Sequence, residues 1–335
     1  MNLQTAVSVL LLLAVLFAGS ASAAEWEPVT ITDDLGVVVE ITKYPERIVS
    51  LSPANTEILF ALGLDERIVG VTEYCTYPEA ALSKEKIGGF STINTEKITV
   101  LNPDLIVAAD GNSEETVSHL RELGYTLITI NADTIERTLA DILLLGKATG
   151  TSAEADELVS SMQADLAEIA EKTADLEKPK ILHCMWIDPL WVSGSGTFQD
   201  EMITAAGGEN AAAAEGGWVA LNMEKFLTMN PDIIVVDSGN GMGVGEDDKL
   251  KNLLMEDPRM QSLSAVQNDR VYVVNADIID RGGPRIVDGV EILATIAHPD
   301  VFGEYGGNDN AALSPGFGML AVLAGLGAVL VLRRK

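Results

Sequence analysis

The chain has 335 residues, of which 22 are basic and 50 acidic, so its formal net charge at pH 7 is −28. This balance excludes a nucleic-acid-binding protein, because contact with phosphates needs a basic face. Apolar residues make up 47% of the chain and charged residues 21%. These fractions exclude a largely disordered polymer, and the length predicts about two domains, each with its own core.

The first residues form an apolar segment that is separate from the fold. Residues 6–18 are apolar apart from Ser8, and Ala21-Ser22-Ala23 has the pattern of a cleavage site. Residues 1–23 are therefore interpreted as a secretory signal peptide, which places the rest of the chain outside the cytoplasm. Because no Lys or Arg precedes the apolar run, an uncleaved short anchor is the alternative.

Residues 24–151 are predicted to form an N-terminal α/β lobe. A strand over 47–51 runs into Ser52-Pro53-Ala54-Asn55 and a helix that ends at Gly63. The segment at 94–107 then reads N-x-E-K-x4-N-P-D-L-I-V, which predicts a short helix that ends before the proline and a buried strand. A polar loop, a helix and a strand that ends in Asn131-Ala132-Asp133 complete the lobe.

A linker helix is predicted over residues 152–178. Between Ser152 and Leu176 the apolar residues recur at helical spacing, Ser152 is placed to cap the start, and Pro179 ends the helix. About 25 residues at 1.5 Å each give close to 38 Å, which is long enough to pass along both lobes. We expect a stiff connection and small changes in the angle between the lobes.

Residues 179–302 are predicted to form a C-terminal α/β lobe that repeats the first. The segment N-x-E-K-x4-N-P-D-I-I-V returns at 222–235, and the later strand again ends in Asn-Ala-Asp, at 275–277. A strand over 180–185 leads through a longer loop to a helix that ends at Gly207-Gly208. The expected fold class is α/β, with two similar lobes of mostly parallel sheets, one long helix joining them, and a ligand cleft between the lobes.

The C-terminal end is predicted to consist of a flexible linker at 303–313 and a sorting or membrane segment at 314–335. Residues 316–332 are uncharged and mostly apolar, and three basic residues follow. At 1.5 Å per residue they span about 25 Å, the short limit for crossing a bilayer. Pro315-Gly316-Phe317, the apolar span and the basic end together resemble the archaeal PGF-type sorting signal, which implies removal of the tail and attachment of a lipid. A plain membrane anchor, the alternative, gives the same location at the outer face of the cytoplasmic membrane.

Several segments in a fixed order resemble the vitamin B12 and ferric-siderophore substrate-binding proteins of ABC importers over roughly residues 29–300. They are RIVSLSPANTEILFALG at 47–63, Tyr74-Cys75-Thr76-Tyr77-Pro78, the two N-P-D segments, WVSGSGTFQDEMITAAGGEN at 191–210, and Arg281-Gly282-Gly283-Pro284-Arg285. The resemblance implies a monomer that captures a corrinoid or ferric siderophore between its lobes. It also implies delivery to a dimeric permease with ATPase subunits, with no enzymatic activity and no cofactor beyond the ligand.

The same resemblance implies that Glu96 and Glu224 dock into arginines of the transporter. Their equivalent places in the internal repeat fit a permease with two-fold symmetry. The alternative is that each is a solvated glutamate in the first turn of a helix, where the helix dipole favours it.

Aromatic residues favour a corrinoid as the ligand. Trp186, Trp191 and Trp218 lie close together in a chain with only 5% aromatic residues. Loop tryptophans are costly to expose, so we predict that they form ligand walls, the alternative being packing under the loops. By resemblance, Tyr74 and Phe90 occupy the positions of corrinoid-contacting aromatics.

Arg281 and Arg285 favour the other ligand class. Two positive charges beside a cleft could receive the anionic oxygens of a ferric siderophore. Alternatively, one arginine braces the glycine loop and pairs with Asp280 or Asp288. The opening segment, with a hairpin-like turn at 34–36, also resembles siderophore-binding members. We favour the corrinoid by a narrow margin.

Other signals are weaker. The three histidines are far apart without H-x-x-x-H spacing, so no metal site is predicted, although His183 could touch the metal of a ligand. A chelatase-like enzyme, the alternative from another class, would need a base, for which His183 with Asp188 is the candidate. Cys75 and Cys184 are predicted to be two thiols, because a disulfide would lock the cleft. The glycines at 239–245 predict a flexible rim, since no Lys-Ser/Thr follows them.

Overall fold

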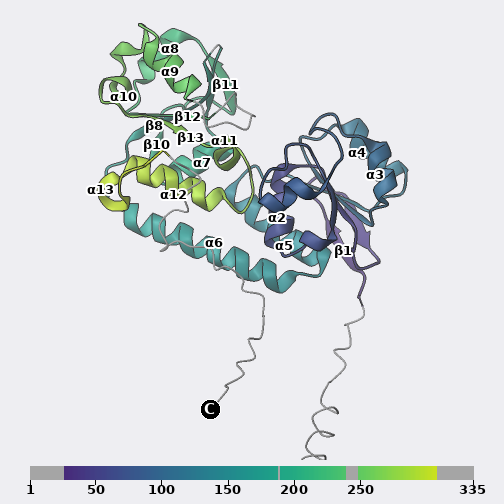
Figure 1. Cartoon of the computed structure of the whole chain (residues 1–335). Helices are drawn as coiled ribbons and strands as arrows, with labels where there is room; N and C mark the ends of the chain where they lie inside the picture. The colour runs from purple at the N-terminus through teal and green to yellow at the C-terminus, as the bar shows by residue number, and fades with distance from the viewer. Residues whose placement is uncertain (1–25, 188, 239–247, 308–335) are drawn as a thin grey trace, which may run out of the picture.

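The computed structural model describes residues 26–187, 189–238 and 248–307. They form two α/β lobes, with helix α6 (Ser152–Thr173) running along both (Figure 1). The predicted signal peptide, Asp188, the glycines at 239–245, most of the predicted linker at 303–313 and the segment at 314–335 lie outside the described residues. Within the described ranges, no helix is both long enough and apolar enough to span a bilayer.

The N-terminal lobe is built on a five-stranded parallel sheet. Its order is β5-β4-β3-β6-β7, with bounds Glu85–Lys86, Ile68–Val71, Ile48–Ser50, Leu105–Ala109 and Leu127–Ile130. Its α-helices are α2 (Pro53–Ala61), α3 (Thr95–Leu101), α4 (Glu114–Glu122) and α5 (Ile135–Thr149). An antiparallel hairpin of β1 (Val29–Thr32) and β2 (Val38–Ile41) closes at the predicted turn.

The C-terminal lobe has a six-stranded mixed sheet. Its order is β11-β9-β8-β12-β13, with bounds Trp218–Leu221, Leu190–Ser193, Lys180–Ile187, Ile233–Asp237 and Val271–Val274, and β10 (Glu209–Asn210) also pairs with β8. Strands β8, β10, β12 and β13 are parallel, as predicted, whereas β9 and β11 are antiparallel. Its α-helices are α7 (Phe198–Ala205), α8 (Met223–Met229), α9 (Lys249–Glu256), α10 (Ser264–Gln267), α11 (Ala276–Ile279), α12 (Ile286–Ala297) and α13 (Pro299–Phe302).

One expectation about this lobe was wrong. The stretch predicted as a longer loop before α7 contains β9, which folds back on β8 as a hairpin. Leu190, Val192 and Ser193 of β9 are buried and Trp191 is partly buried, so the strand packs into the lobe.

The repeated N-x-E-K-x4-N-P-D segments form the same local structure in both lobes. Asn94 and Asn222 cap α3 and α8, each accepting a hydrogen bond of 2.9 Å from a backbone N–H three residues later. Both helices end at an asparagine in the left-handed region, Asn102 at φ 46° and Asn230 at φ 40°. Asparagine tolerates this conformation, and the proline after it prevents the helix from continuing. The predicted order of helix, proline and buried strand is therefore confirmed.

Helix α6 begins at the predicted residue and buries most of the predicted face, but it ends at Thr173 and not at 178 before Pro179. Ala155, Val159, Met162 and Ile169 are buried, whereas Ala170 is exposed. The capping prediction was wrong, because Thr151 occupies the cap position and makes no side-chain bond to the helix.

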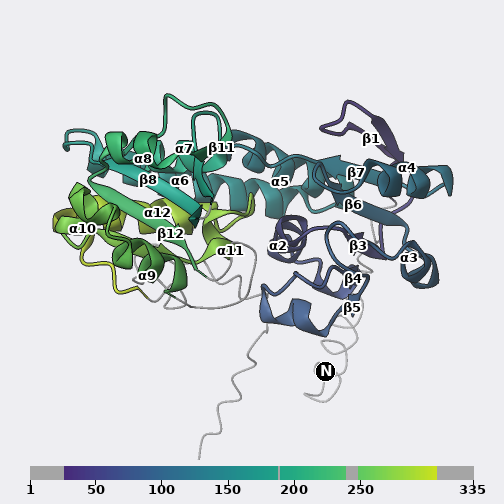
Figure 2. The ribbon, with the colours of Figure 1, turned by 90° about the horizontal axis from the view of Figure 1, so that it is seen from above.

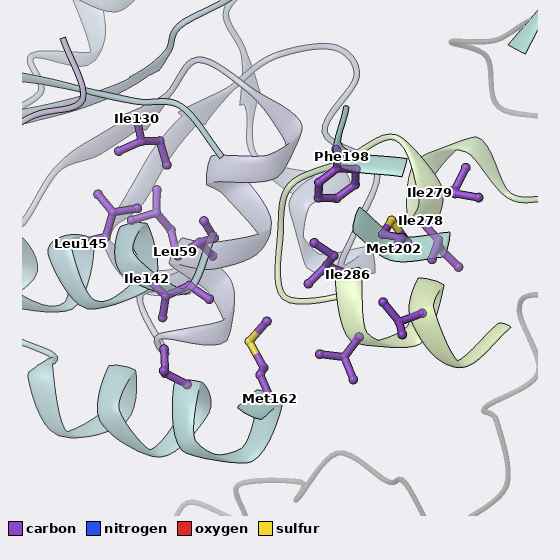
Figure 3. Packing of buried hydrophobic residues seen from close by; sticks show 14 of the residues in the cluster. Leu59, Ile130, Ile142, Leu145, Met162, Phe198, Met202, Ile278, Ile279 and Ile286 are labelled. Atoms are coloured by element: carbon purple, nitrogen blue, oxygen red, sulfur yellow. The ribbon is translucent and has the colours of Figure 1, made fainter. Parts of the chain in front are cut away.

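An apolar cluster extends through both lobes and the linker helix (Figure 3). It contains Leu59, Ile130, Ile142 and Leu145 of the N-terminal lobe, Met162 of α6, and Phe198, Met202, Ile278, Ile279 and Ile286 of the C-terminal lobe. Fully burying one such side chain stabilises a fold by about 1.5–3 kcal/mol. Because both lobes share this cluster, changing the angle between them would expose apolar surface.

Asp141 on α5 is a buried carboxyl beside Asp34 of the hairpin turn. Burial, with the charge of Asp34 adding to it, raises the pKa of Asp141 to about 8. In the unfolded chain this carboxyl ionises near pH 4. Between about pH 4 and pH 8 the unfolded state therefore loses a proton that the folded state keeps, and stability falls as pH rises.

We expect Asp141→Asn to remove this pH-dependent loss of stability. The free energy of unfolding should rise by on the order of 2 kcal/mol at pH 8, and by clearly less at pH 5. Denaturant unfolding of both proteins at the two pH values measures the difference. The same change at pH 5 and pH 8 would contradict the assignment of a protonated Asp141.

Candidate functional site

A cavity of about 560 Å³ lies between the two lobes. The cavity lies at the carboxyl ends of β3, β6 and β7 of one sheet and of β13 of the other, where the loops begin. This is the usual position of ligand sites in α/β folds. The N-terminal lobe contributes Ser52, Pro53, Ala54, Asn55, Tyr74, Phe90, Ser91, Thr92, Ala109, Asp110, Gly111, Ile130, Asn131 and Ala132. The C-terminal lobe contributes Ala276, Asp277, Asp280, Arg281 and Gly282. The predicted interlobe cleft is thus present.

The two Asn-Ala-Asp tripeptides of the internal repeat lie on opposite walls of this cavity. Asn131 and Ala132 line it from one lobe, and Ala276 and Asp277 from the other. The lobes approach closely here, because a Cβ added to Gly282 would lie 2.1 Å from the carbonyl oxygen of Ala132. Glycine is therefore required where these two loops meet.

Tyr74 and Phe90 are brought together on the N-terminal wall. Tyr74 is 49% exposed, and its ring lies against the backbone of Gly89, next to Phe90. Phe90 packs over Gly111, and its carbonyl oxygen accepts a 3.1 Å hydrogen bond from Asn112. This part of the cavity therefore presents flat apolar faces.

The three tryptophans do not line the described cavity. Their expected placement on loops was wrong, because Trp186 lies on β8, Trp191 on β9 and Trp218 on β11. Trp186 is the cross-strand partner of Trp191 and packs against an apolar cluster of the C-terminal lobe. Trp218 is 40% exposed, and its ring meets His183 edge to face at 5.8 Å between centroids.

Arg281 and Arg285 reach across to the N-terminal lobe and share Glu57 of α2. Arg285 donates to the two oxygens of Glu57 at 2.8 and 2.7 Å, and Arg281 donates to Oε1 at 3.3 Å. The Glu57 side chain is only 2% exposed. Arg281 also pairs with Asp277 at 2.5 Å. Of the two arginines, only Arg281 is in the described lining of the 560 Å³ cavity. Arg281 therefore shares this cavity with Tyr74 and Phe90, and Arg285 does not.

The alternative, that one arginine pairs with Asp280 or Asp288, is not what the described residues show, since the ion pairs of Arg281 and Arg285 are with Glu57 and Asp277. Glu57 lies more than 220 residues away in sequence, so no local spacing could reveal it. Arg285 lies over the ring of Tyr77, at 4.1 Å from the guanidinium carbon to the ring centroid. It lines a second cavity of about 440 Å³ between α2, α6 and α12, which also contains Phe60 and Asp288.

His183 belongs to a buried polar cluster. Sequence patterns singled out the histidine but not its partners Asp237 and Ser193. Its Nε2 lies 2.8 Å from Asp237 Oδ1 and its Nδ1 lies 3.1 Å from Ser193 Oγ. Burial lowers the pKa of His183, but the Asp237 carboxylate outweighs burial and the net shift is upward. Asp237 ends β12, the parallel neighbour of β8. Asp188, the expected partner of His183, lies outside the described residues.

Asp280 completes this cluster at the cleft. Its Oδ1 accepts a 2.8 Å hydrogen bond from Gln199. Burial raises the pKa of Asp280 well above its usual range, and the charge of Asp237 adds to this effect. Asp280 therefore ionises less readily than an exposed aspartate.

Cys75 and Cys184 are both free and buried, which confirms two thiols. Cys75 lies 3.1 Å from the hydroxyls of Thr56 and Thr72. Burial, with the charge of Asp237 adding to it, raises the pKa of Cys184 to about 12. Neither cysteine belongs to the described lining of the 560 Å³ cavity.

Glu96 and Glu224 are exposed in the first turns of α3 and α8. These helices lie near opposite ends of the molecule (Figure 2), one on each lobe. The two carboxylates are therefore presented at equivalent positions of the repeat, free to meet another protein.

Comparisons with known proteins agree with this geometry. A family model described as periplasmic binding protein matches residues 48–278. The chain is 37% identical over 314 residues to an uncharacterized ABC transporter substrate-binding lipoprotein of Bacillus subtilis (strain 168), covering 88% of this chain and 97% of the relative. It is 31% identical over 252 residues to the vitamin B12-binding protein of Vibrio cholerae serotype O1, covering 75% and 88%.

Solved structures show the same similarity. The periplasmic heme-binding protein RhuT from Roseiflexus sp. RS-1 in apo form superposes with a TM-score of 0.69 at 28% identity, covering 76% of this chain and 99% of that one. The periplasmic vitamin B12 binding protein BtuF of Vibrio cholerae gives a TM-score of 0.64 at 30% identity, covering 76% and 97%.

Proposed function

The chain belongs to the periplasmic binding protein family, and we propose that, as the substrate-binding protein of an ABC importer, it captures a corrinoid between its lobes and delivers it to the permease. The observation that carries this proposal is the interlobe cavity with Tyr74 and Phe90 on one wall. Flat aromatic faces suit a flat macrocycle, and pockets of 300–1,000 Å³ are typical of small-molecule sites. The relatives named for vitamin B12 and heme support a ligand of this shape.

The charges in the cavity favour a corrinoid over a ferric siderophore. Arg281, the one described cation of the lining, is already paired with Glu57 and Asp277. Asp110 and Asp280 also line the cavity, and the whole chain carries −28. Anionic oxygens of a siderophore would have to displace these carboxylates, whereas the amide groups at the rim of a corrinoid can bond to Asn55 and Asn131.

The proposed route to the cell surface uses both ends of the chain. Residues 1–23 direct secretion, and residues 314–335 act as a PGF-type sorting segment or membrane anchor. Between them, the chain stands outside the cytoplasmic membrane as a monomer. This part comprises the lobes 24–151 and 179–302, the segment 152–178 that contains α6, and the linker 303–313. The lipoprotein relative supports a tethered binding protein. The chelatase-like enzyme is disfavoured, because His183 is buried against Asp237 and Ser193 and lies outside the described lining.

For delivery, we propose that Glu96 and Glu224 contact basic residues on the two halves of the permease. The double variant Glu96→Ala with Glu224→Ala should weaken binding to the cognate permease in membranes by about 100-fold, since rim charges contribute mainly through electrostatic complementarity. Ligand affinity should not change, because both side chains are exposed and lie outside the described lining of the cavity.

The matched control replaces Glu154 and Glu171, which are exposed on α6, by alanine. It removes the same charge from another face and should leave permease binding within about twofold of the unmodified chain. Equal permease binding by the docking variant and the control would refute the assigned docking surface.

A further inference from the structure

Among the described residues, His183, Asp237 and Asp280 form a group of metal-ligating side chains in the C-terminal lobe, and Asp280 lines the interlobe cavity. They come from β8, from the end of β12 and from the residue that ends α11. Each offers one ligand atom, and these atoms all lie within 4.8 Å of one another. His183 and Asp237 are fully buried, and Asp280 is half-buried.

The group holds buried oxygens that no protein donor satisfies. Oδ2 of Asp237, Oδ2 of Asp280 and Oε1 of Gln199 are buried without a hydrogen-bond partner. Asp280 lies within hydrogen-bonding reach of Asp237, and Gln199 is fixed to Asp280 through its Nε2. Unpaired buried acceptors are costly, and a cation held between the two carboxyl groups would satisfy them.

We propose that His183, Asp237 and Asp280 bind a divalent transition-metal ion. One imidazole nitrogen and two carboxylate oxygens suit Zn²⁺ or Co²⁺, whereas Mg²⁺ and Ca²⁺ prefer oxygen ligands alone. Bonds of about 2.0–2.2 Å in a tetrahedral site set the ligand atoms roughly 3.5 Å apart, so side-chain movements of about 1 Å complete the site.

Neighbouring residues already orient the ligands. Ser193 Oγ, 3.1 Å from His183 Nδ1, leaves Nε2 directed at Asp237. Gln199 holds Asp280 Oδ1 at 2.8 Å, which leaves Oδ2 for the ion. Such outer partners are typical of metal sites in which the ligands are fixed before the ion binds.

The interlobe cavity gives the ion a route to these three side chains. Asp280 lines the interlobe cavity, so the ion enters from the cleft. Once bound, it ties the end of α11, next to Arg281, to β8 and β12. This inference does not rest on the proposed chelate ligand.

The test titrates the purified full chain, stripped of metal with a chelator, with Zn²⁺ or Co²⁺ alone. Calorimetry should show saturable binding of about one equivalent. Paramagnetic Co²⁺ should quench part of the tryptophan fluorescence, because the Trp218 ring lies 5.8 Å from that of His183. Trp218→Phe should abolish this quenching and keep Zn²⁺ binding.

His183→Gln and Asp237→Asn should each weaken Zn²⁺ binding by at least about 100-fold, since each removes a ligand. His119→Gln, which changes an exposed histidine on α4, is the matched control and should bind as the unmodified chain does. If the buried variants fail to fold, Asp280→Asn at the half-buried position makes the same test. Absence of saturable binding at millimolar Zn²⁺ and Co²⁺, or unchanged affinity in a folded ligand variant, would overturn the proposal.

Discussion

Replacing Glu57 by glutamine is expected to lower the free energy of unfolding by about 3 kcal/mol or more, because removal of one partner leaves buried charges uncompensated. Glu57 is the carboxylate that Arg281 and Arg285 share across the lobe interface, with contacts of 2.7–3.3 Å. All three side chains are at least 85% buried, with exposures of 2, 15 and 13%. Glutamine keeps the shape of the side chain and one acceptor but removes the negative charge.

The effect should also reach the arrangement of the lobes. Glu57 belongs to α2 of one lobe, and both arginines follow α11 of the other, so the network acts together with the shared apolar cluster. Without it, small-angle scattering should show a wider range of lobe angles, and denaturant unfolding should show the loss of stability.

Glu85→Gln is the matched control for this prediction. Its pair with Lys97, at 3.5 Å, has side chains that are 57% and 49% exposed, and such pairs are worth about 1 kcal/mol or less. If both substitutions changed stability equally, Glu57 would not act as an interlobe ion pair.

The second large effect is expected on ligand binding. Tyr74→Ala combined with Phe90→Ala should weaken corrinoid binding by about 100-fold, since each truncated aromatic contact costs about 1–2 kcal/mol. Both side chains line the 560 Å³ cavity, and neither contributes to the buried core of its lobe. The free energy of unfolding should therefore change little.

Phe60→Ala serves as the control for the choice of cavity. Phe60 lines the 440 Å³ cavity on the side of α6 and lies outside the described lining of the interlobe cavity. Its loss should leave corrinoid affinity unchanged. A larger loss of affinity from Phe60→Ala than from the double variant would place the ligand in the 440 Å³ cavity and contradict binding in the interlobe cavity.

Local sequence patterns were sufficient for much of the fold. The repeated N-P-D segments define a helix, its end and a strand within 14 residues, and capping and proline sterics act over the same range. The same applies to α6, whose apolar spacing is regular over 22 residues. Hairpin β8–β9 was missed because β9 has only four residues and begins five positions after the predicted strand end at 185, too few residues to display an alternating pattern.

The site could be predicted only in part, for a physical reason. Tyr74 and Phe90 follow strands or turns whose position in a parallel sheet determines the edge they reach. By contrast, Glu57 with Arg285, and His183 with Asp237 and Asp280, are joined across 54 to 228 residues. Such contacts depend on lobe packing and strand register, which no local spacing records.

The most direct test of the account is an absorbance titration of the purified full chain with cobinamide, cobalamin, heme and ferric siderophores. We predict a shifted corrinoid band that saturates at about one ligand per chain with a micromolar or tighter Kd, and release of chemically unchanged ligand on denaturation. Saturable binding of a ferric siderophore alone would contradict the corrinoid assignment. No binding of any of these chelates at micromolar concentration, or conversion of the ligand by the protein, would contradict the central claim of capture between the lobes.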